Sequence, residues 1–425
     1  MTETLGGWRR SHSCGELRAE HVGRAVTLMG WAFRRRDHGG LIFIDLRDRE
    51  GVTQCVFNPS ENAEAHAAAQ SVRSEFVLAV AGKVRLRPPG TENPKIPTGL
   101  VEIQVAEVKL LNESRPLPFP LEEESEKGGE PKAGRGMVDE TVRLKYRYLD
   151  LRRPALYKNF VVRDQVCRAA RGHLHAHGFL EVETPFLTRS TPEGARDFLV
   201  PSRLERGSFY ALPQSPQLFK QLLMVAGFER YFQIVRCFRD EDLRKDRQPE
   251  FTQIDIETSF LDRDDFLPLM EGLVAEIFKR VGGIELPLPF PRLTWAQAIE
   301  RYGSDKPDLR FEMELHDVGD AFRGGEFRVF SEALAKGGAV KALRVPGAGS
   351  LSRKELDDLT SRAVELGAKG LAWAKVTSSG FQSPISRFLD LSRALLLERF
   401  DAQQGDLLLF IGDSMPLAAT VLGRL

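Results

Sequence analysis

Cysteine is scarce in this chain, whose 425 residues include only Cys14, Cys55, Cys167 and Cys237 and no Cys-x-x-Cys pair. Structural zinc sites and disulfide frameworks are both built from closely spaced cysteines, so this scatter argues against both, and no metal site is identifiable. Dispersed, reduced cysteines are typical of enzymes that work in a reducing compartment. The sequence therefore predicts a cytoplasmic protein.

Net charge is also lacking, because 60 Lys and Arg residues balance 60 Asp and Glu residues. Contact with a nucleic acid must then come from a local basic patch and not from the field of the whole chain. No apolar run approaches the roughly 20 residues that span a bilayer, and the N-terminal residues lack the apolar centre of a signal peptide. We expect a protein without membrane contact and, from its length, with two or three domains.

Short β-patterned runs dominate residues 25–111. One helix is predicted at residues 61–73, between the third and fourth of these runs. The predicted strands are residues 25–35, 40–47, 52–57, 76–86 and 100–111. Five strands with one interposed helix are typical of a small closed barrel of the oligonucleotide-binding (OB) type.

Cations and one aromatic ring suggest what this barrel binds. The cations lie at neighbouring strand ends and are Arg34, Arg35, Arg36, Arg47 and Arg49. Such a patch suits a groove that follows the phosphates of a nucleic acid. Ile42, Ile44 and Leu46 share a strand face that we expect to fill the barrel, which leaves Phe43 on the outer face. An outward ring suits stacking on unpaired bases, so single-stranded RNA or DNA is predicted; the alternative is that Phe43 packs under a neighbouring loop.

A change of composition follows the barrel. Residues 112–139 carry four prolines and the acidic run Glu122–Glu124, which predicts a solvated hinge. Residues 160–176 have helical spacing that ends at Gly178, and residues 179–185 predict a strand stopped by proline.

The rest of the chain is predicted as two α+β units. Residues 140–307 mix helices and strands, as expected for a domain built on an antiparallel sheet, and residues 308–425 alternate helices with short strands. The predicted strands of this last unit are residues 327–331, 340–345, 372–376 and 406–411.

Residues 231–238 and 251–257 predict two strands joined by a charged loop. One face of the second strand consists of Phe251, Gln253, Asp255 and Glu257. Its other face is mainly apolar, and Arg239 ends the first strand near the polar face. A guanidinium for phosphate and a ring for adenine suit a nucleotide, whereas the alternative is an ordinary hairpin with a charged outer face.

Two further segments precede this strand pair. Residues 190–197 are polar and contain glycine, which suits either a mobile loop that closes over a small ligand or a plain surface turn. Residues 214–221 predict a helix start with Ser215 as its N-cap and Pro216 in its first turn. Gln217 and Lys220 then share one helical face, from which they either hold a substrate's polar groups or are solvated.

In this order, the segments resemble the class II aminoacyl-tRNA synthetases and, within them, the bacterial-type aspartyl enzymes. The resemblance covers nearly the whole chain. Its carriers are Arg143–Arg152, Thr191–Asp197, Gln214–Gln221, Phe238–Glu241, Arg247–Glu257 and Tyr302–Arg310. It implies an OB-fold anticodon-binding domain at residues 1–111, a hinge at 112–139, a class II catalytic domain at 140–307 and, at 308–425, an insertion domain shared with an amidotransferase subunit.

The implied activity is that of an aspartate–tRNA ligase, which forms aspartyl-adenylate from L-aspartate and ATP and transfers the aspartyl group to tRNA(Asp). Arg239 is the implied catalytic residue, because a planar fork of donors can offset charge that develops on phosphorus. The implied aspartate-binding residues are Glu193, Gln217, Lys220, Arg239, Gln253 and Asp255. The implied ATP-binding residues are Arg239, Asp240, Glu241, Gln248 and Phe251. Mg²⁺ accompanies ATP in this family.

The resemblance also implies partners. Phe43, Gln54 and Glu102 correspond to residues that contact the tRNA anticodon, and residues 178–185 correspond to motif 1, which forms a homodimer. His38 and Gly90 occupy positions that separate strict enzymes from relaxed ones. His and Gly look more like the relaxed forms, so tRNA(Asn) is a further candidate substrate, and strict charging of tRNA(Asp) stays open.

The match departs from the family at its end. Motif 3, a His-His pair, a second aspartate-binding arginine and the acidic residues that hold Mg²⁺ are not in these 425 residues. We therefore expect the catalytic domain to be truncated before motif 3 and this chain alone to be inactive. The alternatives are a fragment that retains only anticodon binding, or a sister asparaginyl or lysyl ligase. Lys220 argues against an amide substrate, because a buried ammonium beside a carboxamide would be unpaired.

Overall fold

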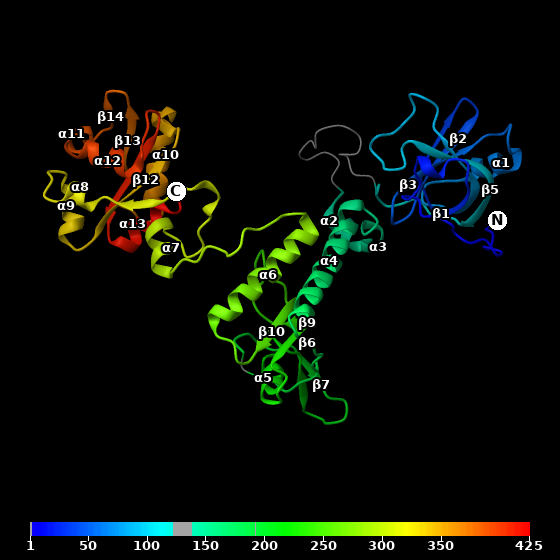
Figure 1. Cartoon of the computed structure of the whole chain (residues 1–425), viewed down its shortest axis with the longest axis horizontal. Helices are drawn as coiled ribbons and strands as arrows, with labels where there is room; N and C mark the ends of the chain where they lie inside the picture. The colour runs from blue at the N-terminus through cyan, green and yellow to red at the C-terminus, as the bar shows by residue number, and fades with distance from the viewer. Residues whose placement is uncertain (1, 122–137, 192) are drawn as a thin grey trace. The chain divides into compact units, whose positions relative to one another are not determined.

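The computed structural model describes residues 2–121, 138–191 and 193–425 (Figure 1). The chain divides into two compact units between Arg168 and Ala169. Within the described ranges, no helix is both long enough and apolar enough to cross a membrane.

The first unit begins with the predicted barrel. Its strands close in the order β1-β2-β3-β5-β4, with β3 and β5 parallel and the other neighbours antiparallel. The elements are β1 (Ala25–His38), β2 (Leu41–Arg47), β3 (Val52–Phe57), α1 (Ala63–Ser71), β4 (Val77–Leu86) and β5 (Val101–Asn112). Ile42, Ile44 and Leu46 are buried in its core, as predicted, and each contributes roughly 1.5–3 kcal/mol by leaving water.

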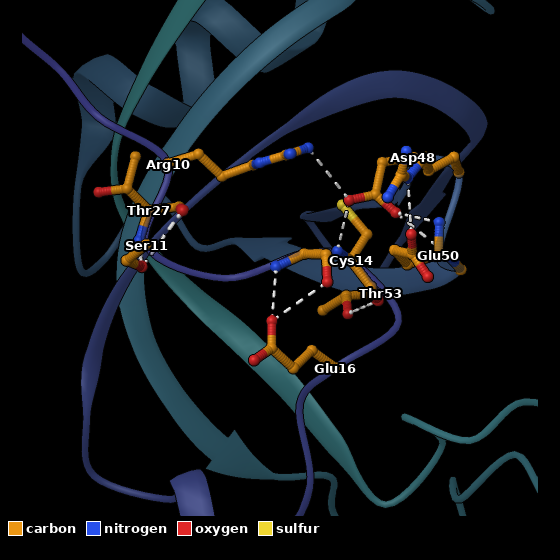
Figure 2. A network of polar contacts seen from close by, with 11 residues as sticks. Arg10, Ser11, Cys14, Glu16, Thr27, Asp48, Glu50 and Thr53 are labelled. Atoms are coloured by element: carbon orange, nitrogen blue, oxygen red, sulfur yellow. Dashed lines mark hydrogen bonds and ion pairs between the residues drawn. The ribbon is translucent and has the colours of Figure 1, made fainter. Parts of the chain in front are cut away.

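Asp48, just after β2, fixes the N-terminal segment to the turn between β2 and β3 (Figure 2). Its Oδ2 accepts a hydrogen bond from the amide of Cys14 at 2.8 Å, and its Oδ1 accepts from the amide of Glu50 at 2.9 Å. A Cβ on Gly15 would lie 2.0 Å from the carbonyl oxygen of Glu50, so this close crossing requires glycine. Burial raises the pKa of the Cys14 thiol, which is therefore an inert part of the core.

The predicted hinge is wrong for its first part. Phe119 and Leu121 are only 5% and 4% exposed, and they pack with Leu149 in one apolar cluster. Prolines alternate with apolar residues here, and an extended Pro-rich segment can bury every second side chain. The acidic run Glu122–Glu124 lies outside the described residues. The helices that follow are α2 (Glu140–Lys145), α3 (Arg147–Asp150) and α4 (Pro154–Ala176).

A three-stranded sheet of order β10-β9-β6 organises the next part of the chain. The antiparallel strands β9 (Arg230–Phe238) and β10 (Glu250–Thr258) confirm the predicted pair, while β6 (Leu180–Glu181) is parallel to β9 and shorter than predicted. Helices α4 and α6 (Arg263–Gly282) pack on its apolar face (Figure 1). Elements beside the sheet are β7 (Leu199–Pro201), β8 (Phe209–Ala211) and α5 (Gln217–Val225).

The last part is built on a five-stranded sheet of order β11-β12-β15-β13-β14. Along β15, Leu407 and Leu409 enter one apolar core and Leu408 and Phe410 enter another, so both sheet faces are buried. The strands are β11 (Leu315–Asp317), β12 (Ala339–Val345), β13 (Ala372–Thr377), β14 (Gly380–Gln382) and β15 (Leu407–Asp413). The helices are α7 (Trp295–Tyr302), α8 (Gly319–Phe322), α9 (Arg328–Ala335), α10 (Arg353–Glu365), α11 (Ser386–Leu389), α12 (Arg393–Phe400) and α13 (Met415–Leu422).

Two expectations for this part change. The strand predicted at residues 327–331 is the start of α9, because Phe327, Phe330 and Leu334 recur at helical spacing and pack into one core. Helix α7 packs with the last part through Ile299, and a Cβ on Gly303 would meet the carbonyl oxygen of Ala419 at 1.9 Å. We therefore propose that the boundary predicted at 307/308 lies before α7.

Candidate active site and nucleic-acid interface

Strands β9 and β10 present a polar floor on the face opposite their apolar core. In their ladder, Gln233 pairs with Asp255 and Val235 pairs with Gln253. Ile254 of β10 points into the apolar core, and because side chains alternate along a strand, the predicted face of Phe251, Gln253, Asp255 and Glu257 lies on the other side.

Lys220 reaches this floor from helix α5. Its Nζ lies 3.1 Å from Oδ1 of Asp255 and 3.3 Å from Oε2 of Glu257, and its side chain is 12% exposed. An ammonium has three N–H donors, so one donor remains for a further anion after these two contacts. The ion pair is therefore compatible with binding a substrate carboxylate as a third partner.

Asp255 is an acid of the floor with a shifted pKa. Burial raises the pKa of Asp255 above the ordinary carboxyl range, although its hydrogen bond with Lys220 opposes the shift. Among the described residues, the buried Oδ2 of Asp255 has no hydrogen-bond donor. A buried acceptor without a partner is costly, which makes this atom a candidate contact for a ligand's ammonium group.

Arg239 follows β9 and lies beside Phe251. Its guanidinium carbon is 5.0 Å from the centre of the Phe251 ring, and its Nε donates to the carbonyl oxygen of Gln214 at 3.4 Å. In the part of the chain that the structure describes, no carboxylate forms an ion pair with Arg239, whose charge is therefore available to an anionic ligand. The structure thus brings the predicted cation and ring together.

The loop with Glu193 is held to the start of α5. Ser215 Oγ donates to Oε2 of Glu193 at 2.7 Å, while Thr191 Oγ1 donates to its Oε1 at 3.1 Å. The predicted N-cap role of Ser215 is wrong, because the N-cap is Pro216 and Ser215 turns its hydroxyl toward Glu193 instead. Gln217 is the first helical residue and shares the α5 face with Lys220.

Sequence reasoning missed Gln214, which is 3% exposed. Its side-chain amide accepts from the amide of Ala195 at 3.1 Å and donates to the carbonyl oxygen of Ala195 at 2.8 Å and to Oδ1 of Asp197 at 2.5 Å. Gln214 thereby holds the loop over α5. A glutamine before a helix carries no local pattern that reveals such a role.

Gln233 was also missed. Its Oε1 accepts from Thr184 Oγ1 at 3.0 Å and from the hydroxyl of Tyr231 at 3.0 Å, and the residue lies directly beside Asp255 in the strand ladder. The network ties Thr184 and Tyr231 to the floor. Cys237 belongs to the same face, and burial raises the pKa of its thiol to about 11, so it packs against Gln253 as a neutral donor and not as a nucleophile.

The loop between β9 and β10 carries the other predicted nucleotide contacts. The amide of Asp240 donates to the carbonyl oxygen of Arg196 at 3.0 Å, which ties this loop to that of Glu193. Glu241 accepts from Arg247 at 3.2 Å, and Gln248 is exposed on the same loop. The backbone of Asp240 thus contacts the loop that carries Glu193, whereas the side chain of Gln248 is exposed to solvent.

The barrel side chains predicted to contact an anticodon differ in exposure. Phe43 is half-buried on the outer face, as the alternation of β2 predicted. Gln54 and Glu102 are 6% and 1% exposed, and Nε2 of Gln54 donates to Oε2 of Glu102 at 2.7 Å. Arg85 donates to the other oxygen of Glu102 at 2.9 Å. The polar atoms of this pair are thus already engaged within the barrel.

The predicted basic patch is wrong in part. Arg47 is 12% exposed and paired with the buried Glu75, so it is not part of a phosphate-binding surface. Arg36 and Arg49 remain at the surface with 54% and 77% of their side chains exposed, although each pairs with a carboxylate. His38 and Gly90 are both exposed, at the end of β1 and in the β4–β5 connection.

Within the described ranges, no three His, Cys, Asp or Glu side chains come close enough together to hold a metal ion. The residues present therefore do not form a protein-built Mg²⁺ site, and no step proposed below depends on one. A cavity of about 730 Å³ lies in the last part of the chain, between α9 and the start of α13, and none of its lining residues belongs to the polar floor.

Comparison with known proteins places this site in a family. Residues 139–408 match the family described as tRNA synthetases class II (D, K and N), and residues 26–111 match the OB-fold nucleic acid binding domain. The chain belongs to the class II tRNA synthetases. Its OB-fold barrel and its catalytic domain with an antiparallel sheet are confirmed.

This synthetase has close curated relatives. An aspartate–tRNA(Asp/Asn) ligase of Geotalea uraniireducens (strain Rf4) is 55% identical over 426 residues, which cover 100% of this chain and 70% of the relative. The ligase of the same description from Moorella thermoacetica (strain ATCC 39073 / JCM 9320) is 56% identical over 426 residues, which cover 100% of this chain and 69% of the relative.

Solved structures of synthetases share the fold. The asparaginyl-tRNA synthetase of Pyrococcus horikoshii, solved with asparaginyl-adenylate, matches with a TM-score of 0.58 and 20% identity over 97% of this chain and 95% of that one. The asparaginyl-tRNA synthetase of Entamoeba histolytica matches with a TM-score of 0.52 and 23% identity, covering 70% and 69% of the two chains. At these identities the likeness supports the fold alone.

Proposed function

We propose that this class II synthetase is an aspartate–tRNA ligase that activates L-aspartate with ATP and transfers it to the 3′ end of tRNA(Asp). The polar floor supports this proposal most strongly, because Lys220, Asp255 and Arg239 combine a carboxylate site, an ammonium site and a phosphate site. Curated relatives about 55% identical over the whole chain are described as aspartate–tRNA ligases.

Lys220 and Asp255 account for the choice of aspartate. The third donor of Lys220 meets the side-chain carboxylate. Glu193 and Oδ2 of Asp255, which has no donor among the described residues, accept from the α-ammonium. Gln217 and Gln253 complete the pocket as neutral partners. Asparagine would leave the ammonium of Lys220 beside an amide, which lacks the compensating charge.

Arg239 is the proposed catalytic residue. Attack of the aspartate α-carboxylate on the α-phosphorus of ATP displaces pyrophosphate and builds negative charge on the phosphoryl oxygens. A guanidinium fixed by Gln214 and by the Phe251 ring offers two parallel donors to those oxygens without any proton transfer. The residue thus stabilises the transition state by position and charge.

The nucleotide lies on the same strand pair in this proposal. Phe251 offers a ring face to the adenine, and Asp240, Glu241 and Gln248 border it from the loop between β9 and β10. Mg²⁺ is proposed only as a companion of the ATP phosphates, since the described residues do not assemble a site for it.

The barrel is the proposed anticodon-binding domain. Phe43 stacks on an anticodon base. Gln54 and Glu102 contact base edges after the hydrogen bond between them is replaced by hydrogen bonds to the RNA. We further propose that the protein charges tRNA(Asn), because its relatives are described as Asp/Asn ligases and the exposed His38 and Gly90 are the positions of that distinction.

The proposal also covers where the protein is located and how its subunits assemble. A cytoplasmic homodimer, formed through residues 178–185, remains our proposal for location and assembly. Leu180 and Phe186 are 53% and 44% exposed in the single chain, which suits a covered surface between subunits.

The direct test is exchange of labelled pyrophosphate into ATP in the presence of aspartate, asparagine or lysine. The same assay tests the inactivity of this chain alone, which stays a prediction from sequence. Exchange that depends on aspartate by at least about 100-fold over asparagine supports the proposal. Exchange driven equally by asparagine or lysine contradicts it.

A further inference from the structure

Glu75, between α1 and β4, is a buried carboxylate that the proposed function does not use. Its side chain is 2% exposed, and its backbone adopts the left-handed conformation with φ 65°. Its two oxygens accept hydrogen bonds from Nη2 of Arg47 at 2.8 and 2.9 Å, and Oε2 also accepts from Nη1 of Arg152 at 2.6 Å. Arg47 belongs to the barrel, but Arg152 belongs to the segment between α3 and α4.

Arg152 makes a second, independent contact with the barrel. Its guanidinium carbon lies 4.8 Å from the centre of the Trp31 ring of β1. Arg47 repeats this arrangement with the ring of Phe33, at 4.6 Å. Each arginine thus pairs with the same carboxylate and stacks on its own ring, a geometry that fixes both the position and the plane of a guanidinium.

The segment that carries Arg152 is itself fixed. Asp150, two residues earlier, has a side chain with no exposed area. It accepts from Nε of Arg143 at 3.0 Å and from Nη1 of Arg147 at 2.7 Å. Arg152 is therefore presented to the barrel by a rigid turn whose sequence, Arg143–Arg152, is one of the carriers of the family resemblance, although that resemblance assigned it no role.

We propose that Glu75, Arg152 and Trp31 form a joint that sets the orientation of the barrel on the α2–α3 segment, and that Glu75 and Arg152 are positioning residues for aminoacyl transfer. A tRNA is long, and its 3′ end lies far from the anticodon that the barrel holds. A small rotation of the barrel at the joint therefore moves the 3′ end by a large distance. Displacement of about 1 Å from the productive geometry can cost about 100-fold in rate. Adenylate formation needs no such alignment, because it involves only small substrates.

The proposal rests on the proposed function and is tested first by separating the two reaction steps. Arg152→Gln removes the joint and leaves the Arg47–Glu75 pair in the barrel. We expect aminoacylation at saturating tRNA to fall by about 10- to 100-fold, while pyrophosphate exchange and the tRNA Kd each change by less than about 2-fold. Arg152→Lys keeps the charge but loses the fork, and it should recover part of the rate. Arg168 is an exposed arginine of α4 that pairs with Asp164 in the described part of the chain, so Arg168→Gln is the matched control and should behave as wild type.

A second readout does not depend on activity. Hydrogen exchange of the backbone amides in residues 147–153 should be faster in Arg152→Gln and in Glu75→Gln than in wild type, with the β1–β4 ladder of Arg152→Gln unchanged. Unchanged amide exchange in both variants overturns the joint. A parallel fall of pyrophosphate exchange and aminoacylation overturns the positioning role, because it indicates general destabilisation. Absence of tRNA charging by the wild-type protein bears on the proposed function and not on the joint, which amide exchange then decides alone.

Discussion

The barrel and the polar floor of β9 and β10 are both rich in charged and amide side chains. The two regions differ in whether the polar atoms of these side chains are paired with one another. On the barrel, Glu102 meets Gln54 and Arg85, and Glu75 meets two arginines. On the floor, Oδ2 of Asp255 has no donor among the described residues. A closed network holds parts of a protein in place, whereas an open one is poised for a ligand.

The acids of the two regions show the same contrast. Burial acts to raise the pKa of Asp150, yet Arg143 and Arg147 outweigh it and hold the pKa below the ordinary range. At Asp255 the single Lys220 does not outweigh burial, and the pKa stays raised. Two arginines thus outweigh burial at Asp150, whereas at Asp255 the neighbouring carboxylates of Glu257 and Glu193 add to the effect of burial.

The largest expected effect is at Arg239. Arg239→Ala removes the proposed donors to the transferring phosphoryl group, so the rate of aspartate-dependent pyrophosphate exchange should fall by about 10³-fold. The control is Arg236→Ala on strand β9, just before Arg239; its partner is the exposed Glu250, and its loss should change the rate by less than about 2-fold. Equal effects in the two variants would remove Arg239 from the mechanism.

Lys220 should show the next largest effect. Lys220→Met keeps the length of the side chain but leaves Asp255 and Glu257 without their shared cation and removes the donor for the substrate carboxylate. We expect kcat/KM for aspartate to fall by about 100-fold, measured by pyrophosphate exchange at varied aspartate. A loss confined to ATP affinity would place the amino acid elsewhere.

Asp150 tests the closed network through pH. Its folded-state pKa is lowered, so its stabilising effect is present above the ordinary carboxyl pKa and is lost as the pH falls through the folded value. Asp150→Asn should therefore lower the free energy of unfolding by about 2 kcal/mol near pH 7, a value discounted because Arg143 and Arg147 are partly exposed. The difference from wild type should shrink below about pH 4 in urea denaturation. A difference that is constant with pH would contradict the ion-pair account.

Phe43 separates RNA binding from stability. Phe43→Ala should weaken tRNA binding by about 10-fold, the loss of one stacked base, without changing pyrophosphate exchange. Filter binding of tRNA(Asp) measures the first quantity. Loss of folded barrel in place of lost affinity would show that Phe43 packs under a loop, the alternative reading of its position.

Asp255 should give the smallest effect and the opposite sign to Asp150. Its folded-state pKa is raised, so the associated stability is present below the ordinary carboxyl pKa and is lost as the pH rises through the folded value. The stability of wild type relative to Asp255→Asn should then fall as the pH rises from roughly 4 toward neutral, in the same urea series used for Asp150. If the stability of wild type relative to Asp255→Asn rises over this pH range, the pKa of Asp255 is not raised in the folded protein.

Alternation along strands made the barrel and the floor predictable. Successive side chains of a strand point to opposite faces, so Ile42 and Ile44 of β2 face inward and Phe43 faces outward. The same alternation puts Ile254 and Asp255 on opposite faces of β10. The roles of Ser215, Arg47 and Gln214 were not predictable. Each depends on a partner distant in sequence, Glu193, Glu75 or Ala195, and local periodicity contains no information about such pairs.

The central claim is that the floor of β9 and β10 is where aspartate meets ATP. The most direct measurement is a crystal structure of the protein with a non-hydrolysable aspartyl-adenylate analogue. The account predicts the ligand carboxylate on Nζ of Lys220, its ammonium on the free Oδ2 of Asp255 and its phosphate on Arg239, each within about 3.2 Å. An analogue bound with its phosphate away from Arg239, or with its carboxylate away from Lys220, would contradict it.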